Sequence, residues 1–124
     1  MFEVSVVLNF SAAHNLRGYQ GKCEALHGHN WKVEAVLKSE KLNEAGMCED
    51  FHVIKEKLSG ILELFDHKYL NSLSYFKKIN PTSENIARLI YQKMNEKMRR
   101  HSGIVVSCIK VWETPSSCAV YQEP

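Results

Sequence analysis

The sequence predicts an α+β protein in which two helices cover one face of an antiparallel sheet. Apolar and polar residues alternate near both ends of the chain, which is typical of half-buried strands. Between these ends, the apolar residues repeat every three to four positions, as they do along a helix. The predicted element order is ββααββ. Two hairpins and two helices in this order favour a four-stranded antiparallel sheet with both helices packed on one face.

The first two strands are predicted on either side of a long polar segment. In residues 2–10, the alternating apolar positions are Phe2, Val4, Val6, Leu8 and Phe10. Residues 31–38 alternate in the same way, from Trp31 to Leu37. The segment 11–28 between them is polar and rich in turn-forming residues. A loop of this length in a compact protein usually has a function.

Two amphipathic helices and a second hairpin follow. An apolar stripe between Val53 and Phe65 predicts the first helix. Residues 81–84 (Pro-Thr-Ser-Glu) begin the second, because they offer a hydroxyl N-cap and an acid in the first turn. Gly103 suits its C-terminal end. The β-branched segment 104–113 predicts a third strand, residues 114–117 a turn, and residues 118–121 a short fourth strand.

Composition narrows the class of protein. We expect the 124 residues to form a single domain, 1–124, with its own core. A net charge of +2 is too small to indicate a nucleic-acid partner. There is no apolar segment approaching the roughly 20 residues that cross a bilayer, and no signal-like N-terminal region, so we expect a cytoplasmic protein. The four cysteines form no CxxC pair and are interpreted as free thiols.

Three histidines indicate a metal site. His27 and His29 are two residues apart, so in an extended chain both imidazoles lie on the same face. Gly28 between them leaves room for another backbone or a ligand. His14 precedes them in the same polar segment. Three histidines without an evident fourth protein ligand describe a zinc site with an open position, as in catalytic centres.

Other candidate residues have less specific patterns. Cys23 is either a fourth zinc ligand or a nearby thiolate base or nucleophile, and its spacing does not separate these readings. In Asp66-His67, the acid could fix the tautomer of the histidine, although neighbours in sequence need not touch. Glu113 ends an apolar strand, where a solvated carboxylate is ordinary. His52 and His101 have no comparable neighbours and are interpreted as ordinary residues.

Taken together, these segments resemble the 6-pyruvoyl-tetrahydropterin synthase family. The matching motifs occur in the family's order over nearly the whole chain: Phe10-Ser11-Ala12-Ala13-His14, Cys23-Glu24-Ala25-Leu26-His27-Gly28-His29-Asn30, Glu49-Asp50-Phe51, Asp66-His67-Lys68-Tyr69-Leu70-Asn71, Pro81-Thr82-Ser83-Glu84-Asn85 and Glu113-Thr114. Three residues separate Cys23 from His27. That short gap is similar to the 6-carboxy-5,6,7,8-tetrahydropterin synthases of queuosine biosynthesis, whereas biopterin-forming members typically have a longer one.

The resemblance implies the tunnelling fold (T-fold) and a homohexamer of two stacked trimers, in which sheets join into a barrel and active sites lie at subunit interfaces. Such closure would remove the exposed edges of an open sheet. It also implies a zinc-dependent lyase that converts 7,8-dihydroneopterin triphosphate to 6-carboxy-5,6,7,8-tetrahydropterin, acetaldehyde and triphosphate, without an external redox cofactor.

Residue by residue, the resemblance makes His14, His27 and His29 the zinc ligands and Cys23 the general base. Asp66-His67 becomes a proton relay, and Glu113 binds the pterin, with Thr82 lining the pterin pocket. Arg17 and Lys22 are candidate triphosphate contacts. One alternative is the 6-pyruvoyl-tetrahydropterin reaction, in which triphosphate is eliminated without side-chain cleavage. The other is a non-catalytic, zinc-stabilised pterin-binding module, in which Cys23 ligates the metal.

Overall fold

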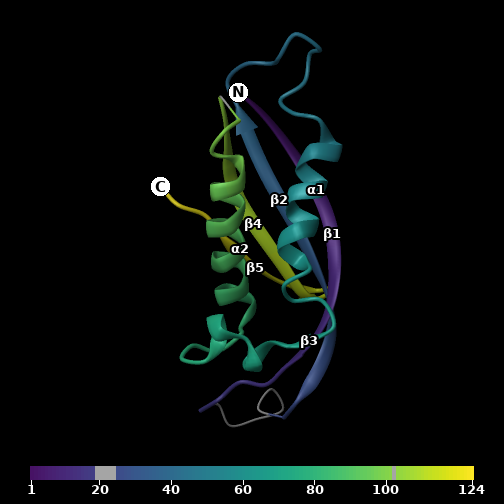
Figure 1. The fold of residues 1–124 in the computed structure, drawn as a ribbon, viewed down its shortest axis with the longest axis vertical. Helices are drawn as coiled ribbons and strands as arrows, with labels where there is room; N and C mark the ends of the chain where they lie inside the picture. The colour runs from purple at the N-terminus through teal and green to yellow at the C-terminus, as the bar shows by residue number, and fades with distance from the viewer. Residues whose placement is uncertain (19–24, 102) are drawn as a thin grey trace.

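Five strands form one sheet in the order β3-β1-β2-β4-β5 (Figure 1). The structure is a computed structural model and describes residues 1–18, 25–101 and 103–124. The long strands β1 (Phe2–His14) and β2 (His27–Ser39) pair antiparallel along their whole length. On the other side of β2, β4 (Ile104–Thr114) and β5 (Ser117–Tyr121) continue the antiparallel pairing. The α+β class and the two hairpins are confirmed.

Both helices lie against the same face of the sheet, as predicted (Figure 1). Helix α1 (Phe51–Leu62) begins after Asp50, whose carboxylate accepts a hydrogen bond from a main-chain N–H in the first turn. Helix α2 (Ser83–Met98) begins after Thr82, whose hydroxyl caps it in the same way. Within the described residues, no helix is both long and apolar enough to cross a membrane.

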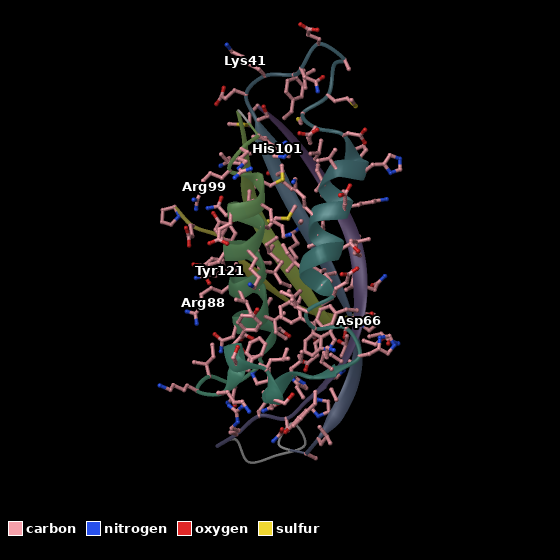
Figure 2. All side chains as sticks on the ribbon, in the orientation of Figure 1. Lys41, Asp66, Arg88, Arg99, His101 and Tyr121 are labelled. Atoms are coloured by element: carbon pink, nitrogen blue, oxygen red, sulfur yellow. The ribbon has the colours of Figure 1, made fainter. Side chains whose placement is uncertain are left out.

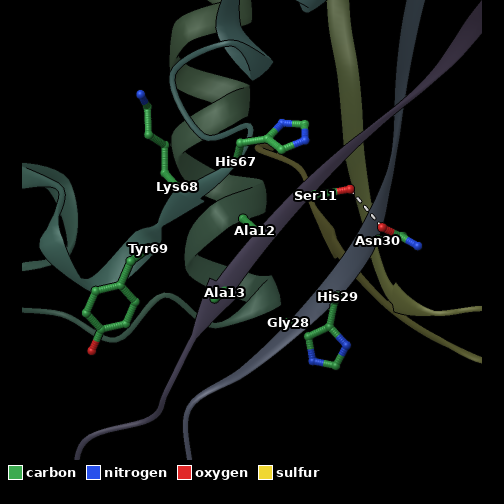
Figure 3. A pocket seen from close by; sticks show the side chains of 9 residues that line it. All are labelled: Ser11, Ala12, Ala13, Gly28, His29, Asn30, His67, Lys68 and Tyr69. Atoms are coloured by element: carbon green, nitrogen blue, oxygen red, sulfur yellow. Dashed lines mark hydrogen bonds between the residues drawn. The ribbon is translucent and has the colours of Figure 1, made fainter.

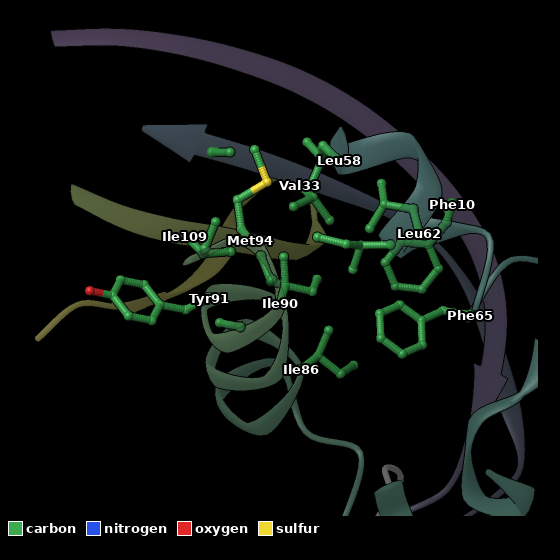
Figure 4. Close-up of a cluster of buried hydrophobic side chains, with 14 of the residues drawn as sticks. Phe10, Val33, Leu58, Leu62, Phe65, Ile86, Ile90, Tyr91, Met94 and Ile109 are labelled. Atoms are coloured by element: carbon green, nitrogen blue, oxygen red, sulfur yellow. The ribbon is translucent and has the colours of Figure 1, made fainter. Parts of the chain in front are cut away.

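The core fills the layer between sheet and helices (Figure 4). It takes alternate residues from the strands and the apolar stripe of each helix, as the two periodicities require. Three aromatic rings pack together at one end of the core. Phe10 stacks on Trp31 with 5.8 Å between ring centroids, and Phe65 packs on Phe10 at 5.7 Å. Trp31 and Phe65 are fully buried. Burial of an aromatic or aliphatic side chain of this kind contributes about 1.5–3 kcal/mol.

The sheet has one strand more than predicted. Residues 68–69 form β3 (Lys68–Tyr69), which pairs parallel to β1 at Ala12 and Ala13. Just before β3, the main-chain N–H of His67 donates a hydrogen bond to the Ser11 carbonyl at 2.6 Å. A two-residue strand has no periodicity of its own to detect, and the contact joins residues more than 50 positions apart. Two short 3₁₀ turns, η2 (Leu70–Ser72) and η3 (Ser74–Phe76), lead from β3 towards α2.

The first two strands are longer than the predicted segments 2–10 and 31–38. The strand β1 continues to His14, and β2 already begins at His27, directly opposite it. The polar composition of segment 11–28 favoured a loop, but continuous ladder pairing across the hairpin outweighs this local preference. As a result, the three candidate metal ligands stand on strands.

The three cysteines in the described segments, Cys48, Cys108 and Cys118, form no disulfide. Cys108 is buried, and this burial raises the pKa of its thiol above the ordinary value of 9.0. The free-thiol interpretation holds for these three. Cys23 lies outside the described residues, so its thiol is not placed.

An ion pair that was not predicted joins the segment before α1 to the segment after α2. His101 Nδ1 lies 2.8 Å from Glu49 Oε2, and both side chains are mostly buried. The pair is well separated along the long axis of the molecule from Asp66 (Figure 2). The structure thus gives His101 a partner that its sequence neighbours did not indicate. His52, by contrast, is exposed.

Candidate metal centre and adjoining pocket

The three candidate ligands meet where β1 ends and β2 begins. In the antiparallel register His14 lies opposite His27, and Ala12 lies opposite His29. Residues two apart on a strand share a face, so all three imidazoles point to the side that the helices cover. The predicted convergence of these histidines is therefore present in the fold.

Four polar atoms gather there within 4.8 Å of one another: one ring nitrogen from each histidine and one carboxylate oxygen from Glu113. The Nε2 atoms of His14 and His27 are 3.0 Å apart. Glu113 Oε1 lies 3.1 Å from His14 Nε2 and 3.1 Å from His29 Nε2. His14 is buried, with 1% of its surface exposed. The residue pattern alone indicated a solvated strand end for Glu113, whereas the resemblance placed it in the site; its carboxylate lies beside two of the histidines.

Main-chain carbonyls fix the tautomers of two histidines. His14 Nδ1 lies 2.8 Å from the Pro81 oxygen, and His27 Nδ1 lies 2.6 Å from the Ala25 oxygen. A carbonyl oxygen only accepts, so each Nδ1 is the donor and carries the proton. In the neutral imidazole, each Nε2 then carries a lone pair that points into the cluster. Such partners typically orient metal-ligating histidines.

The ring of Trp31 packs against the histidine cluster from the side of the hydrophobic core. The Trp31 ring centroid lies 4.9 Å from that of His14 and 5.2 Å from that of His29, edge to face. Trp31 Nε1 donates to the Ala12 carbonyl at 3.2 Å, and its ring stacks on Phe10. The imidazoles therefore rest on a fully buried, hydrogen-bonded ring, which limits their movement.

The charges and lone pairs of this cluster fit a bound cation. Two Nε2 lone pairs and a carboxylate oxygen converge with no donor between them, which is repulsive unless a proton or a metal ion lies at the centre. His29 Nε2 is buried and makes no hydrogen bond with a described residue, although Glu113 lies near. Burial lowers the pKa of His29 below 6.5, against the opposing pull of Glu113, and so favours the neutral form that binds metals.

The spacing is compatible with zinc. Zinc binds imidazole nitrogen at about 2.0–2.1 Å, and a tetrahedron of that size has edges of about 3.3–3.4 Å. Three of the separations among the four atoms are 3.0, 3.1 and 3.1 Å, and all lie within 4.8 Å. A small outward movement of the ligands would accommodate the ion.

Asp66 and His67 form a second pair, next to β1. Asp66 Oδ1 accepts a hydrogen bond from the Ser11 main-chain N–H at 2.9 Å and lies 3.1 Å from His67 Nδ1. The Ser11 contact holds the pKa of Asp66 below its ordinary value of 3.8; burial acts in the opposite direction, and His67 lowers the pKa further. His67 adopts a φ of 59°, which is uncommon for a residue with a side chain and typical of functional sites.

A pocket of about 520 Å³ is lined by His29 from the first cluster and His67 from the second (Figure 3). Its other lining residues lie on β1, β2 and β3. Gly28 is part of the wall. A Cβ built on Gly28 would meet only the Ala12 carbonyl oxygen, at 3.9 Å, so the fold itself does not require a glycine here. Its effect is to keep this wall of the pocket open.

The remaining candidates lie elsewhere or outside the described residues. Thr82 uses its hydroxyl to cap α2 and adjoins Pro81, the partner of His14. Arg17 donates to the main-chain carbonyls of Asn71, Phe76 and Ile79, so its guanidinium holds that segment in place. The role of Arg17 as a triphosphate contact stays a prediction. Cys23 and Lys22 lie outside the described residues.

Comparison with known proteins places the chain in a family of pterin synthases. The family model for 6-pyruvoyl tetrahydropterin synthase matches residues 3–124. A 6-carboxy-5,6,7,8-tetrahydropterin synthase of Synechocystis is 36% identical, over 94% of this chain and 89% of that protein. One from Rickettsia bellii is 32% identical, over 88% of this chain and 91% of that protein.

Solved structures agree on the fold. The 6-pyruvoyl tetrahydropterin synthase of Caenorhabditis elegans superposes with a TM-score of 0.88 at 29% identity, over 99% of this chain and 96% of that one. The Plasmodium falciparum protein superposes with a TM-score of 0.75 at 21% identity, which supports the fold alone.

Proposed function

Since the chain belongs to the 6-pyruvoyl tetrahydropterin synthase family, we propose that it is a zinc-dependent lyase of queuosine biosynthesis. It converts 7,8-dihydroneopterin triphosphate to 6-carboxy-5,6,7,8-tetrahydropterin, acetaldehyde and triphosphate, and residues 1–124 form one catalytic domain. The observation that carries the proposal is the convergence of three histidine ring nitrogens and one carboxylate oxygen within 4.8 Å. The names of relatives with up to 36% identity support the choice of product.

His14, His27 and His29 would hold the zinc ion. When bound, zinc acts as a Lewis acid on the hydroxyl oxygens of the substrate side chain and makes the neighbouring carbon protons easier to remove. The Pro81 and Ala25 carbonyls keep the ring protons of His14 and His27 on Nδ1. The ligating nitrogens therefore remain available.

Proton transfer falls to Cys23 and to the Asp66–His67 pair. Cys23 serves as the general base that takes a proton from a side-chain carbon, because a thiolate near cations has a lowered pKa. Asp66 orients His67, as a carboxylate beside an imidazole commonly does. Glu113 accepts hydrogen bonds from two adjacent donors of the pterin ring, and Thr82 lines the pterin pocket.

The working assembly is a homohexamer of two trimers. The outermost strands of the sheet, β3 and β5, pair on one side only, and unpaired edges favour association with another sheet. Figure 1 shows both helices on one face and leaves the other face bare. That face exposes Val7 and Val120, which closure of a barrel would shield. Light scattering should give a mass six times that of the 14.3 kDa chain; a monomer would contradict this assembly.

A second candidate is formation of 6-pyruvoyl tetrahydropterin. The observation that favours it is the similarity to the C. elegans structure of that name, with a TM-score of 0.88. The two reactions share metal, base and substrate and differ in whether the side chain is cleaved. Only the first releases acetaldehyde, so product analysis separates them.

A pair of variants tests the enzyme against a non-catalytic zinc-binding module. In the proposed enzyme, Cys23→Ala retains zinc and loses turnover, whereas His27→Ala loses both. In a binding module with Cys23 as ligand, both variants lose zinc. Zinc content per chain, measured by atomic absorption, gives the answer independently of any activity. Loss of zinc from Cys23→Ala would remove the cysteine from its catalytic role.

A further inference from the structure

Glu113 lies two residues after the buried Val111 on β4, so its side chain shares the face on which the histidines lie. Trp112 pairs with Cys118 across the β4–β5 hairpin, but Thr114 pairs with Ser117, so Glu113 has no partner of its own. The β2–β4 ladder ends one residue earlier, at Trp112. The carboxylate of this unpaired residue lies against His14 and His29.

The surroundings of this carboxylate suit a metal ligand. Its side chain is 29% exposed; among the described residues, the ring nitrogens of His14 and His29 lie against it and no lysine or arginine pairs with it. The His14 Nε2 that faces it carries a lone pair in the neutral ring, since the ring proton is committed to the Pro81 carbonyl. A carboxylate beside imidazole lone pairs needs a cation, and carboxylate oxygen binds zinc at about 2.0–2.2 Å.

We propose that Glu113 is the fourth metal ligand in the substrate-free protein and leaves the metal when a pterin ring binds. This inference rests on the proposed function, in which the same carboxylate holds the pterin. The metal ion and the pterin ring then compete for the same carboxylate oxygen of Glu113. Metal and pterin ring weaken each other's binding, by the same factor in both directions because binding equilibria are linked. The substrate's side-chain hydroxyls take the vacated position on the metal.

A competition titration with a chelator tests the first half of the proposal. We expect Glu113→Gln to weaken zinc binding at least about tenfold, since even groups that only hydrogen-bond to ligands account for about 10–100-fold. Glu49→Gln is the matched control, because Glu49 also lies against a histidine but at a distant site; it should leave zinc affinity unchanged. Circular dichroism checks that both variants fold. Unchanged zinc affinity in folded Glu113→Gln would overturn the proposal.

The second half uses a ring without the hydroxylated side chain, 6-methylpterin. Added to the cobalt-substituted protein, it should change the visible absorption of the metal and weaken chelator-measured metal affinity. In Glu113→Gln it should do neither. Quenching of protein fluorescence shows that 6-methylpterin binds. If it binds but leaves the cobalt spectrum and the metal affinity unaltered, the ligand exchange is excluded. If 6-methylpterin does not bind at all, the exchange is excluded as well.

These tests are separate from turnover. A wild-type protein that passes them yet makes no product would contradict the proposed function and leave the ligand exchange standing. Conversely, the wild-type protein could form the expected products while Glu113→Gln leaves its metal affinity unchanged. That result would support the proposed function and contradict the ligand exchange.

Discussion

The Pro81 carbonyl oxygen accepts a hydrogen bond from His14 Nδ1–H at 2.8 Å, which links the residue just before the cap of a helix to the candidate metal centre. Pro81 precedes Thr82, the N-cap of α2. A proline has a fixed φ and no main-chain donor, so its carbonyl is held in a narrow range of directions. The position of α2 therefore determines how one metal ligand is oriented.

This link predicts an effect of a helix cap on metal binding. Thr82→Ala removes the hydroxyl that accepts the Asn85 N–H at 3.1 Å. Loss of such a cap costs about 1 kcal/mol of unfolding free energy. Because the first turn then frays next to Pro81, zinc affinity should also fall, by less than about tenfold. Thermal melting and chelator competition measure the two effects. Thr82→Ser should restore both; a stability loss with unchanged zinc affinity would refute the coupling.

The open wall of the pocket predicts that Gly28→Ala impairs substrate binding without lowering the stability of the fold. The added Cβ meets only the Ala12 oxygen, at 3.9 Å, so the fold should accept it. Replacing glycine by alanine at an unstrained position stabilises by about 0.4–1 kcal/mol through the unfolded chain. The methyl group nevertheless projects from a residue that lines the pocket, so KM should rise at unchanged or higher melting temperature. An unaltered KM would mean that substrate does not use this wall.

The lowered pKa of Asp66 predicts that the protein loses part of its stability at acid pH. A carboxyl group whose folded-state pKa lies below 3.8 contributes stability above that pH, and the contribution is lost as the pH falls through the folded-state value. The stability difference between wild type and Asp66→Asn should therefore shrink below pH 3.8. Urea unfolding from pH 6 downwards measures it. A difference that stays constant over this range would contradict the prediction.

A second variant separates the two contacts of Asp66. The Ser11 N–H is the largest cause of the shift, and His67 contributes less. His67→Asn should thus keep most of the acid dependence, and asparagine tolerates the positive φ at this position. If this variant behaves like Asp66→Asn, the Ser11 contact is not the main cause.

The Glu49–His101 pair should contribute to stability and not to the metal site. Its atoms are 2.8 Å apart and mostly buried. A hydrogen bond of this kind typically contributes about 0.5–1.5 kcal/mol. His101→Gln should lower the unfolding free energy by about that amount while zinc affinity and turnover remain unchanged. Loss of zinc from this variant would show a coupling between the two ends of the molecule that the structure does not suggest.

Patterns within single elements were sufficient for much of the fold. The apolar stripes of both helices and the Thr82 cap were visible in sequence, because helical periodicity and capping are local. The shared face of His27 and His29 was visible for the same reason, since strand side chains alternate.

What the sequence did not reveal depends on contacts between distant segments. The strand β3 exists because His67 and Lys68 meet β1, and a two-residue strand carries no pattern. The Pro81 and Ala25 carbonyls that orient the histidines are main-chain atoms, which sequence motifs do not display. The position of Glu113 beside the histidines depends on the alignment of β4 with β2, which neither strand shows by itself.

The central claim is tested most directly by the products. Zinc-loaded protein is incubated with 7,8-dihydroneopterin triphosphate, and acetaldehyde and the pterin are measured together. We expect acetaldehyde and 6-carboxy-5,6,7,8-tetrahydropterin in equal amounts. A pyruvoyl pterin without acetaldehyde, or no turnover by the zinc-loaded protein, would contradict it.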